Sequence, residues 1–191
     1  DPIVEETRKE FFDANIQIPM VLVCYRTPSM KSRDAYVLDM ISTILSDGKS
    51  SRLYKKMVDE KKISLQVQAV NLGLEDYGGY VILSLPLGEN SLDDLLVNIE
   101  EEVVKLQNEL ISDREYSKLQ NIFENNFVSS NASMAGVANS LARYYMLYGN
   151  TNLINDQIDI YKSITKEEIR DVARKYLKKN QRAIIDYLPK K

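Results

Sequence analysis

Hydrophobic and polar positions follow two different periods along the chain, and these periods predict strands and helices in a definite order. Residues 63–69 alternate, with Ile63, Leu65, Val67 and Ala69 on one face and Ser64, Gln66 and Gln68 on the other. Alternation of this kind is typical of a half-buried strand. Further strands are predicted over residues 16–25, 80–87 and 181–188, and the turn-rich residues 71–79 should form a hairpin connection.

Apolar residues that recur every three or four positions predict the helices. The first helix covers residues 33–46 and ends before Gly48, where a left-handed cap is expected. Capping boxes begin two later helices, because Ser112 and Thr165 each stand three residues before a glutamate. Other helices are predicted as a short basic one after Gly48, from Ser91, from Ser133, and around residues 154–161.

The order of these elements, with helices gathered between early and late strands, predicts an α+β fold. We expect a mixed or antiparallel sheet with helices packed mainly on one face. The other face should be the more polar one and could form a groove lined by Gln66, Gln68, Ser84 and Asp186. The sequence favours a single domain over residues 1–191, with residues 1–14 as a polar lead-in, and the start at Asp1-Pro2 suggests excision from a longer chain.

Composition and charge exclude several classes of protein. The 191 residues are 44% hydrophobic and 28% charged, as in an ordinary globular protein. The net charge of −3, without a long block of like charge, gives no footprint of nucleic-acid binding. No apolar run approaches the roughly 20 residues that cross a bilayer. We therefore expect neither a nucleic-acid partner nor a membrane span.

The chain contains no histidine and only one cysteine, Cys24. A zinc site built on HExxH or on its inverse, HxxEH, is therefore impossible in it, and so is a Ser-His-Asp triad. A transition-metal site would have to rest on carboxylates, which is uncommon for zinc. We predict no catalytic residue, no metal ligand and no cofactor in this chain.

Other candidate motifs have plain structural explanations. Ser50 and Ser51 fit a helix cap, and Arg52 then fits a solvated arginine. The acid pairs Glu75-Asp76 and Asp93-Asp94 fit a loop and the first turn of a helix. Because the sequence places no pair of acids in a pocket, an independent carboxylate-based hydrolase is a weak alternative.

A series of short segments carries a family resemblance through their order and spacing. The segments are GKSSRLY at residues 48–54, VDEKKIS at 58–64, YRTP at 25–28, EDYG at 75–78, the cap at 111–115, and the helices over 138–148 and 164–176. Together they resemble the C-terminal half-domain of the pitrilysin/insulinase family of zinc metallopeptidases. They are also similar to bacterial zinc proteases and to subunits of the mitochondrial processing peptidase type.

The resemblance implies a LuxS/metallohydrolase-like half-domain that is inactive and binds no metal. In that family, two homologous α+β units enclose a chamber, and the other unit holds zinc on HxxEH with a distant glutamate. The implied partners are thus an HxxEH-bearing half, in the same chain or in a partner subunit, and a peptide substrate. Zinc would belong to that partner half. The implied origin is bacterial, in the periplasm or the cytoplasm.

The resemblance also suggests residues for the chamber wall. The candidates are Arg52, Tyr54, Gln66, Gln68 and Ser84, although Gln66 and Gln68 fit solvent-facing strand positions equally well. Many family members carry an arginine and, seven residues later, a tyrosine that hold the substrate near the zinc. The matching positions here are Val58 and Leu65. Neither side chain can donate a hydrogen bond to a polarised carbonyl.

Two functions stay open on this basis. The chain is either the non-catalytic half of a zinc metalloendopeptidase, which helps to enclose and bind peptide, or a structural subunit of the same family without any peptidase role. The missing arginine and tyrosine favour the structural role somewhat. An HxxEH motif in the parent chain or in a partner would favour the peptidase role.

Overall fold

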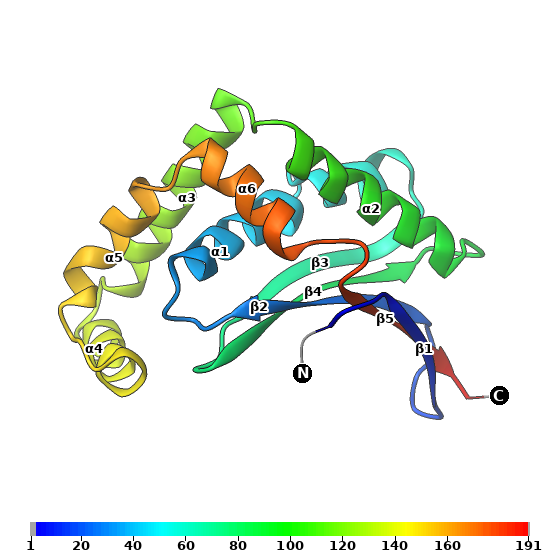
Figure 1. Cartoon of the computed structure of the whole chain (residues 1–191), viewed down its shortest axis with the longest axis horizontal. Helices are drawn as coiled ribbons and strands as arrows, with labels where there is room; N and C mark the ends of the chain where they lie inside the picture. The colour runs from blue at the N-terminus through cyan, green and yellow to red at the C-terminus, as the bar shows by residue number, and fades with distance from the viewer. Residues whose placement is uncertain (1–2, 191) are drawn as a thin grey trace.

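A five-stranded mixed sheet forms one layer of the molecule in the computed structural model, which describes residues 3–190 (Figure 1). The strands lie in the order β1-β5-β2-β4-β3. β1 runs parallel to β5, and the other neighbouring strands are antiparallel. The strands are β1 Thr7–Asp13, β2 Met20–Pro28, β3 Ser64–Leu72, β4 Tyr77–Pro86 and β5 Arg182–Pro189. Asp1 and Pro2, where the expected lead-in begins, lie outside the described residues.

Helices form the second layer and cover one face of the sheet (Figure 1). They are α1 Arg33–Ser46, the π-helix η1 Tyr54–Glu60, α2 Leu92–Asn108, α3 Asp113–Ser130, α4 Met134–Tyr148, α5 Leu153–Lys162 and α6 Lys166–Tyr176. In Figure 1, α1, α2 and α6 lie over the strands, and α3, α4 and α5 extend past one end of the sheet. The predicted α+β fold is confirmed. None of the helices within residues 3–190 is long and apolar enough to cross a membrane.

The core fills the space between α1 and the sheet. Leu38, Ile41 and Leu45 of α1 are fully buried, and Val23 of β2 is buried in the same hydrophobic cluster. Burying each such side chain contributes about 1.5–3 kcal/mol. The spacing of three and four residues on α1 is the same pattern that predicts a helix over residues 33–46, so the packing explains the pattern.

Three helices begin at capping boxes. Ser91 of α2, Ser112 of α3 and Thr165 of α6 each accept a hydrogen bond from the backbone N–H three residues later, and the acid at that later position accepts one in return. A cap of this kind contributes about 1 kcal/mol. The two boxes predicted at Ser112 and Thr165 are confirmed, and the structure adds the box at Ser91.

The N-terminal segment differs from the expected polar lead-in, because Thr7–Asp13 forms the edge strand β1. It pairs in parallel with β5, from Thr7 beside Ala183 to Asp13 beside Pro189. Its side chains are nearly all exposed, so the segment lacks the apolar face by which a strand is recognised. Arg8 joins β1 to the sheet, since its Nε lies 2.7 Å from Asp186 Oδ2.

The centre of the uncovered face of the sheet is apolar, which corrects the expectation of a polar face, although Gln66 and Gln68 lie on that face at its β3 edge, in register with Leu85 and Leu83. Leu22 lies between Leu83 and Ile185 in the strand register, and all three are partly exposed. Ser84 and Asp186, which were expected there, are buried on the helix side instead. A period of two shows which residues share a face, but it does not show which of the two faces the helices will cover.

A bulge near the start of β3 breaks the predicted alternation. The register shifts between Ser64 and Gln66, and Leu65 is 47% exposed although it was expected on the buried face with Val67 and Ala69. A bulge adds one residue to a strand, so side chains before it change sides relative to those after it. Val67 and Ala69 themselves are buried as predicted.

The short basic helix is a π-helix, which the sequence did not predict. The N–H of Lys61, which caps the C-terminal end of η1, donates to Lys56 O, five residues back, at 2.9 Å, as in π-helical turns. Met57 is fully buried and anchors η1 to the core. Lys62 follows with a positive φ of 51° and turns the chain into β3.

Candidate functional site

A polar cavity of about 590 Å³ lies beside β3, the strand at one edge of the sheet. Gln66 and Gln68 line it from β3, Asp39 and Ser46 from α1, and Asn126 from α3. Gln66 and Gln68 are exposed. The structure therefore brings together the two glutamines that the sequence suggests for a substrate-facing wall. Their role in binding peptide stays a prediction.

The outer edge of β3 is partly closed by α1. Ala69 N–H donates to Ser46 Oγ at 2.8 Å, and Ser46 Oγ donates to Ala69 O at 3.3 Å. An edge strand normally offers unpaired backbone groups to an added strand, but those of Ala69 are already bonded. A peptide that paired with this edge would therefore have to displace Ser46 at Ala69.

A partly buried carboxylate, Asp39, lies where this cavity adjoins a second one. Its Oδ1 accepts a hydrogen bond from Asn71 Nδ2 at 2.8 Å, and its Oδ2 accepts one from the Tyr161 hydroxyl at 2.9 Å. Burial raises the pKa of Asp39, because a poorly hydrated site disfavours the charged form. Burial and the neighbouring carboxylate also raise the pKa of Tyr161, so its hydroxyl stays protonated and remains a donor.

Arg52 and Tyr54 lie apart from the glutamine-lined cavity. Arg52 lines a separate cavity of about 420 Å³, and its guanidinium is bound to Glu115 through hydrogen bonds of 2.8 and 3.1 Å. Tyr54 is partly buried in the first turn of η1. The structure therefore does not bring these two candidates together with Gln66 and Gln68.

The other three predicted residues, Ser84, Val58 and Leu65, do not line the glutamine-lined cavity. Ser84 is fully buried, and its hydroxyl lies 2.9 Å from that of Ser64, so it faces the protein interior. Val58 packs against the core from η1. Leu65 is exposed at the bulge. Val58 and Leu65, where the family arginine and tyrosine are missing, thus present only hydrocarbon to their surroundings.

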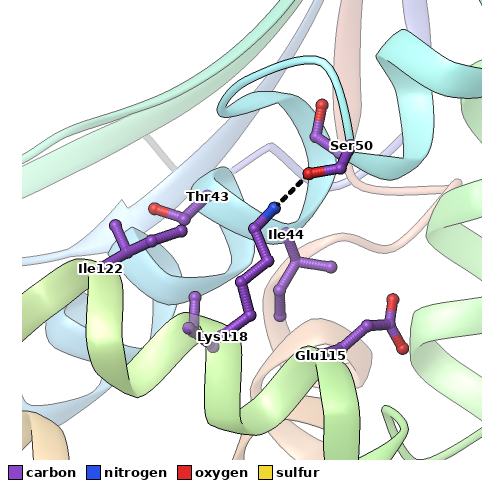
Figure 2. Close-up of a pocket in the computed structure, with 8 residues that line it drawn as sticks. Thr43, Ile44, Ser50, Glu115, Lys118 and Ile122 are labelled. Carbon is purple, nitrogen blue, oxygen red and sulfur yellow. Dashed lines mark hydrogen bonds between the residues drawn. The ribbon is translucent and has the colours of Figure 1, made fainter.

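A smaller cavity of about 40 Å³ lies between α1, α3 and the turn before η1 (Figure 2). Lys118 of α3 reaches across it and donates to Ser50 Oγ at 2.6 Å. The nearby Ser51 closes the turn, since its Oγ donates to Gly48 O at 2.7 Å. The volume suits a few water molecules rather than an organic ligand, so this cavity is not a substrate site.

The residues of this chain do not fit a zinc ion. Zinc sites in proteins use histidine and cysteine, often with a carboxylate, and the sequence has no histidine and one cysteine. Within residues 3–190, no group of three or more histidine, cysteine, aspartate or glutamate side chains lies close enough to hold a metal ion. No chemical step that depends on zinc can therefore be assigned to these residues.

Sequence reasoning missed the side chains that meet around Asp39. Tyr161 follows Asp39 by 122 residues and Asn71 follows it by 32, so no local pattern links the three. The only available signal is the position of Asp39 within α1, where it interrupts a stripe of apolar residues. A charged residue beside core positions is seldom buried without hydrogen-bond partners.

Comparison with known proteins relates the chain to peptidase domains. A family profile described as peptidase M16 inactive domain matches residues 2–123. The zinc protease PqqE of Helicobacter pylori is 25% identical over 174 residues, which make up 91% of this chain and 39% of that protein. The chain thus spans about two fifths of the length of this curated relative.

Solved structures share the fold over almost the whole chain. A protease from Helicobacter pylori superposes with a TM-score of 0.90 at 22% identity, over 98% of this chain and 45% of the other. An inactive peptidase domain from Bordetella parapertussis gives a TM-score of 0.81 at 22% identity, over 92% of this chain and 94% of the other. At these identities the likeness concerns the fold alone.

Proposed function

Because this chain belongs to the peptidase M16 inactive-domain family, we propose that it is the non-catalytic half of a zinc metalloendopeptidase. In this role it encloses part of a chamber and helps to bind a peptide. A separate half that carries HxxEH holds the zinc and supplies the chemistry. That half lies either in the same longer chain or in a partner subunit.

The observation that carries this proposal is the lack of histidine in a chain whose family match spans residues 2–123. Without the usual ligands, the domain cannot hold the zinc that would activate a water molecule. It nevertheless keeps polar side chains for holding a peptide. Gln66 and Gln68 bring exposed amide donors and acceptors to the edge strand β3, beside the cavity of about 590 Å³. Extended peptides commonly bind at the edge of a sheet, where main-chain hydrogen bonds give affinity and contacts with alternate peptide side chains give specificity.

The test uses the full protein that carries this chain, at fixed zinc concentration, with a quenched fluorescent peptide library. Cleavage should require the domain, although the domain itself binds no zinc. Replacing both Gln66 and Gln68 by arginine adds bulk and charge at the cavity, and it should raise KM several-fold without changing the zinc content. Gln17→Arg, an exposed position between β1 and β2, is the matched control and should leave KM unchanged. Equal cleavage without the domain would overturn the proposal.

A structural role in an assembly is the second candidate. It is favoured by Val58 and Leu65, which offer no hydrogen-bond donor to a substrate. The apolar uncovered face of the sheet would then serve as a contact surface, since such patches commonly mark protein interfaces. A full protein that is inert toward peptides, but loses its assembly state on light scattering when the domain is deleted, would support this role over the first.

A further inference from the structure

A second cavity, of about 300 Å³, lies between α1, α4 and α5. It shares Asp39 and Asn71 with the glutamine-lined cavity. The side chains that carry the following inference are Tyr36, Asp39, Arg143, Tyr148 and Tyr161. Neither the family match nor the proposed peptide-binding role gives this cavity a function.

Asp39 brings a carboxylate to this cavity without a bound cation. Asn71 and Tyr161, its two hydrogen-bond partners, are both neutral. Among residues 3–190, no lysine or arginine forms an ion pair with Asp39. Burying a carboxylate costs free energy unless a positive charge accompanies it. A cationic ligand would therefore be stabilised here, and it would in turn favour the ionised form of Asp39.

Three tyrosine rings line the same cavity as this carboxylate. Tyr36 and Tyr161 meet edge to face, with ring centroids 5.3 Å apart, and Phe123 packs on Tyr161 at 4.2 Å. Tyr148 adds a third tyrosine from α4. The faces of aromatic rings attract organic cations. Burial raises the pKa of Tyr36 to about 12, so this hydroxyl adds no second negative charge at neutral pH.

Arg143 of α4 also lines the cavity and carries the opposite charge. Its charge favours the ionised form of Asp39 and opposes the effect of burial. Arg143 is nevertheless exposed, and it forms no ion pair with Asp39 among the residues that the structure describes. A ligand cation would thus compete with Arg143 for the carboxylate, rather than displace a formed salt bridge.

We propose that this cavity binds a protonated primary amine, with the ammonium group on Asp39 and the carbon chain against Tyr36, Tyr148 and Tyr161. The volume of about 300 Å³ accommodates a chain of several carbon atoms. The amine belongs either to a small molecule or to a lysine side chain of a peptide, which present the same chemical group. This binding does not depend on the proposed peptidase role.

Calorimetric titration of the 191-residue chain tests the site with n-butylammonium, and n-butanol serves as the neutral analogue of the same length. We expect the ammonium to bind with a Kd of about 1 mM and butanol to bind at least about tenfold more weakly. Asp39→Asn keeps the shape of the side chain but removes its charge, so it should also cost at least about tenfold. Asp156→Asn, at an exposed acid of α5, is the matched control and should bind as the wild type does.

Two further variants separate a binding site from a carboxylate that only supports the fold. Arg143→Gln removes the competing charge, so it should tighten ammonium binding. Tyr148→Ala removes part of the aromatic wall and should weaken binding, whereas Tyr145→Ala, on the same helix but 68% exposed, should not. This pair of tyrosine variants decides the question even if Asp39→Asn fails to fold.

The results also identify the source of the amine. A blocked tripeptide with a central lysine that competes with n-butylammonium would assign the site to a peptide side chain, and competition by free amines alone would assign it to a small molecule. Failure of n-butylammonium to bind would overturn the proposal, as would equal binding by the wild type and by Asp39→Asn. None of these readouts uses peptide cleavage, so they stand or fall separately from the peptidase role.

Discussion

Arg52 and Glu115 form a two-pronged ion pair, in which Arg52 Nε lies 2.8 Å from Glu115 Oε1 and Arg52 Nη2 lies 3.1 Å from Oε2. The pair joins the segment before η1 to the first turn of α3. Glu115 Oε2 also accepts a hydrogen bond from the backbone N–H of Ser112 at 3.0 Å. The Glu115 carboxylate therefore takes part both in the N-terminal cap of α3 and in the tertiary contact with Arg52.

Acid should destabilise the protein partly through Glu115. Burial alone would raise the pKa of this carboxyl, but hydrogen bonds from Arg52 and Ser112 outweigh it and lower the pKa from 4.5 to about 2. Because the folded-state pKa is the lower one, the stabilisation is present above about pH 4.5 and is lost as the pH falls toward 2. Glu115→Gln should therefore show a shallower loss of unfolding free energy across this range in urea titrations.

The arginine side of the same pair gives an independent check at neutral pH. Arg52→Met should lower the unfolding free energy by about 1 kcal/mol, as expected for a partly exposed bidentate pair. Arg170→Met is the matched control, because among residues 3–190 Arg170 pairs only with its sequence neighbour Asp171, whose side chain is 57% exposed, and it should cost less. If Glu115→Gln lost stability in acid as steeply as the wild type, the acid dependence could not be assigned to Glu115.

Arg182 should be a strong determinant of stability. It is 2% exposed on β5, and it pairs with Glu6 at 2.7 Å and with Glu100. Arg182→Leu leaves both carboxylates without this partner, although Lys179 still pairs with Glu100 at 3.0 Å. We expect a loss of about 2 kcal/mol in unfolding free energy, measured by urea denaturation.

The control for Arg182 is Arg26 on the neighbouring strand β2. Its guanidinium lies 3.9 Å from the ring centroid of Tyr77, and it forms no ion pair among residues 3–190. Stacking of this kind contributes about 0.5–1 kcal/mol at exposed sites, so Arg26→Leu should cost less than Arg182→Leu. Equal costs for the two substitutions would show that the buried ion pairs do not set the stability of β5.

The start of β4 should not tolerate a methyl group at Gly78. A Cβ atom there would lie 2.6 Å from Thr27 Oγ1 and 2.8 Å from Leu72 O, which is closer than atoms can pack. Gly78→Ala should therefore lower the unfolding free energy by about 1–3 kcal/mol. The adjacent Gly79→Ala should be nearly neutral, since its Cβ would lie 3.9 Å from Tyr25 O. Thermal unfolding of the two variants tests this contrast.

Zinc should have no effect on the stability of this chain. Its residues do not fit a zinc ion, so neither zinc nor a chelator should change the Tm in differential scanning fluorimetry. A ligand that binds the folded state at 100 times its Kd would contribute about 2.7 kcal/mol, which is a shift of several degrees. A rise in Tm of this size on adding stoichiometric zinc would reveal ligands that the sequence does not suggest.

The periodic elements of this fold were predictable, because their pattern and their packing have the same cause. The helix predicted over residues 33–46 has the same bounds as α1, since Leu38 and Ile41 must share a face to be buried. β1 escaped prediction because its exposed side chains show no apolar face. It is a strand only because β5, from the far end of the sequence, supplies its hydrogen bonds.

The candidate site was predictable only in part, for a related reason. Gln66 and Gln68 share a face through local alternation, so their joint placement follows from the sequence. Asp39 meets Tyr161 across 122 residues, and this contact depends on how α5 packs against α1. Ser84 was assigned to the wrong face of the sheet because alternation alone cannot say where the helices will lie.

The strand order has a consequence for the chain while it is being made. β5 lies between β1 and β2, yet the five helices α2 to α6 separate it from β4 in the sequence. β2, β3 and β4 can pair with one another early. The other edge of β2, and β1 as a whole, have no hydrogen-bonded neighbour in the sheet until β5 has been made. At 5–20 residues per second, translation from Pro86 to Arg182 takes roughly 5–20 s. Throughout that interval the nascent chain carries an unpaired apolar strand edge, which is the kind of template that drives aggregation.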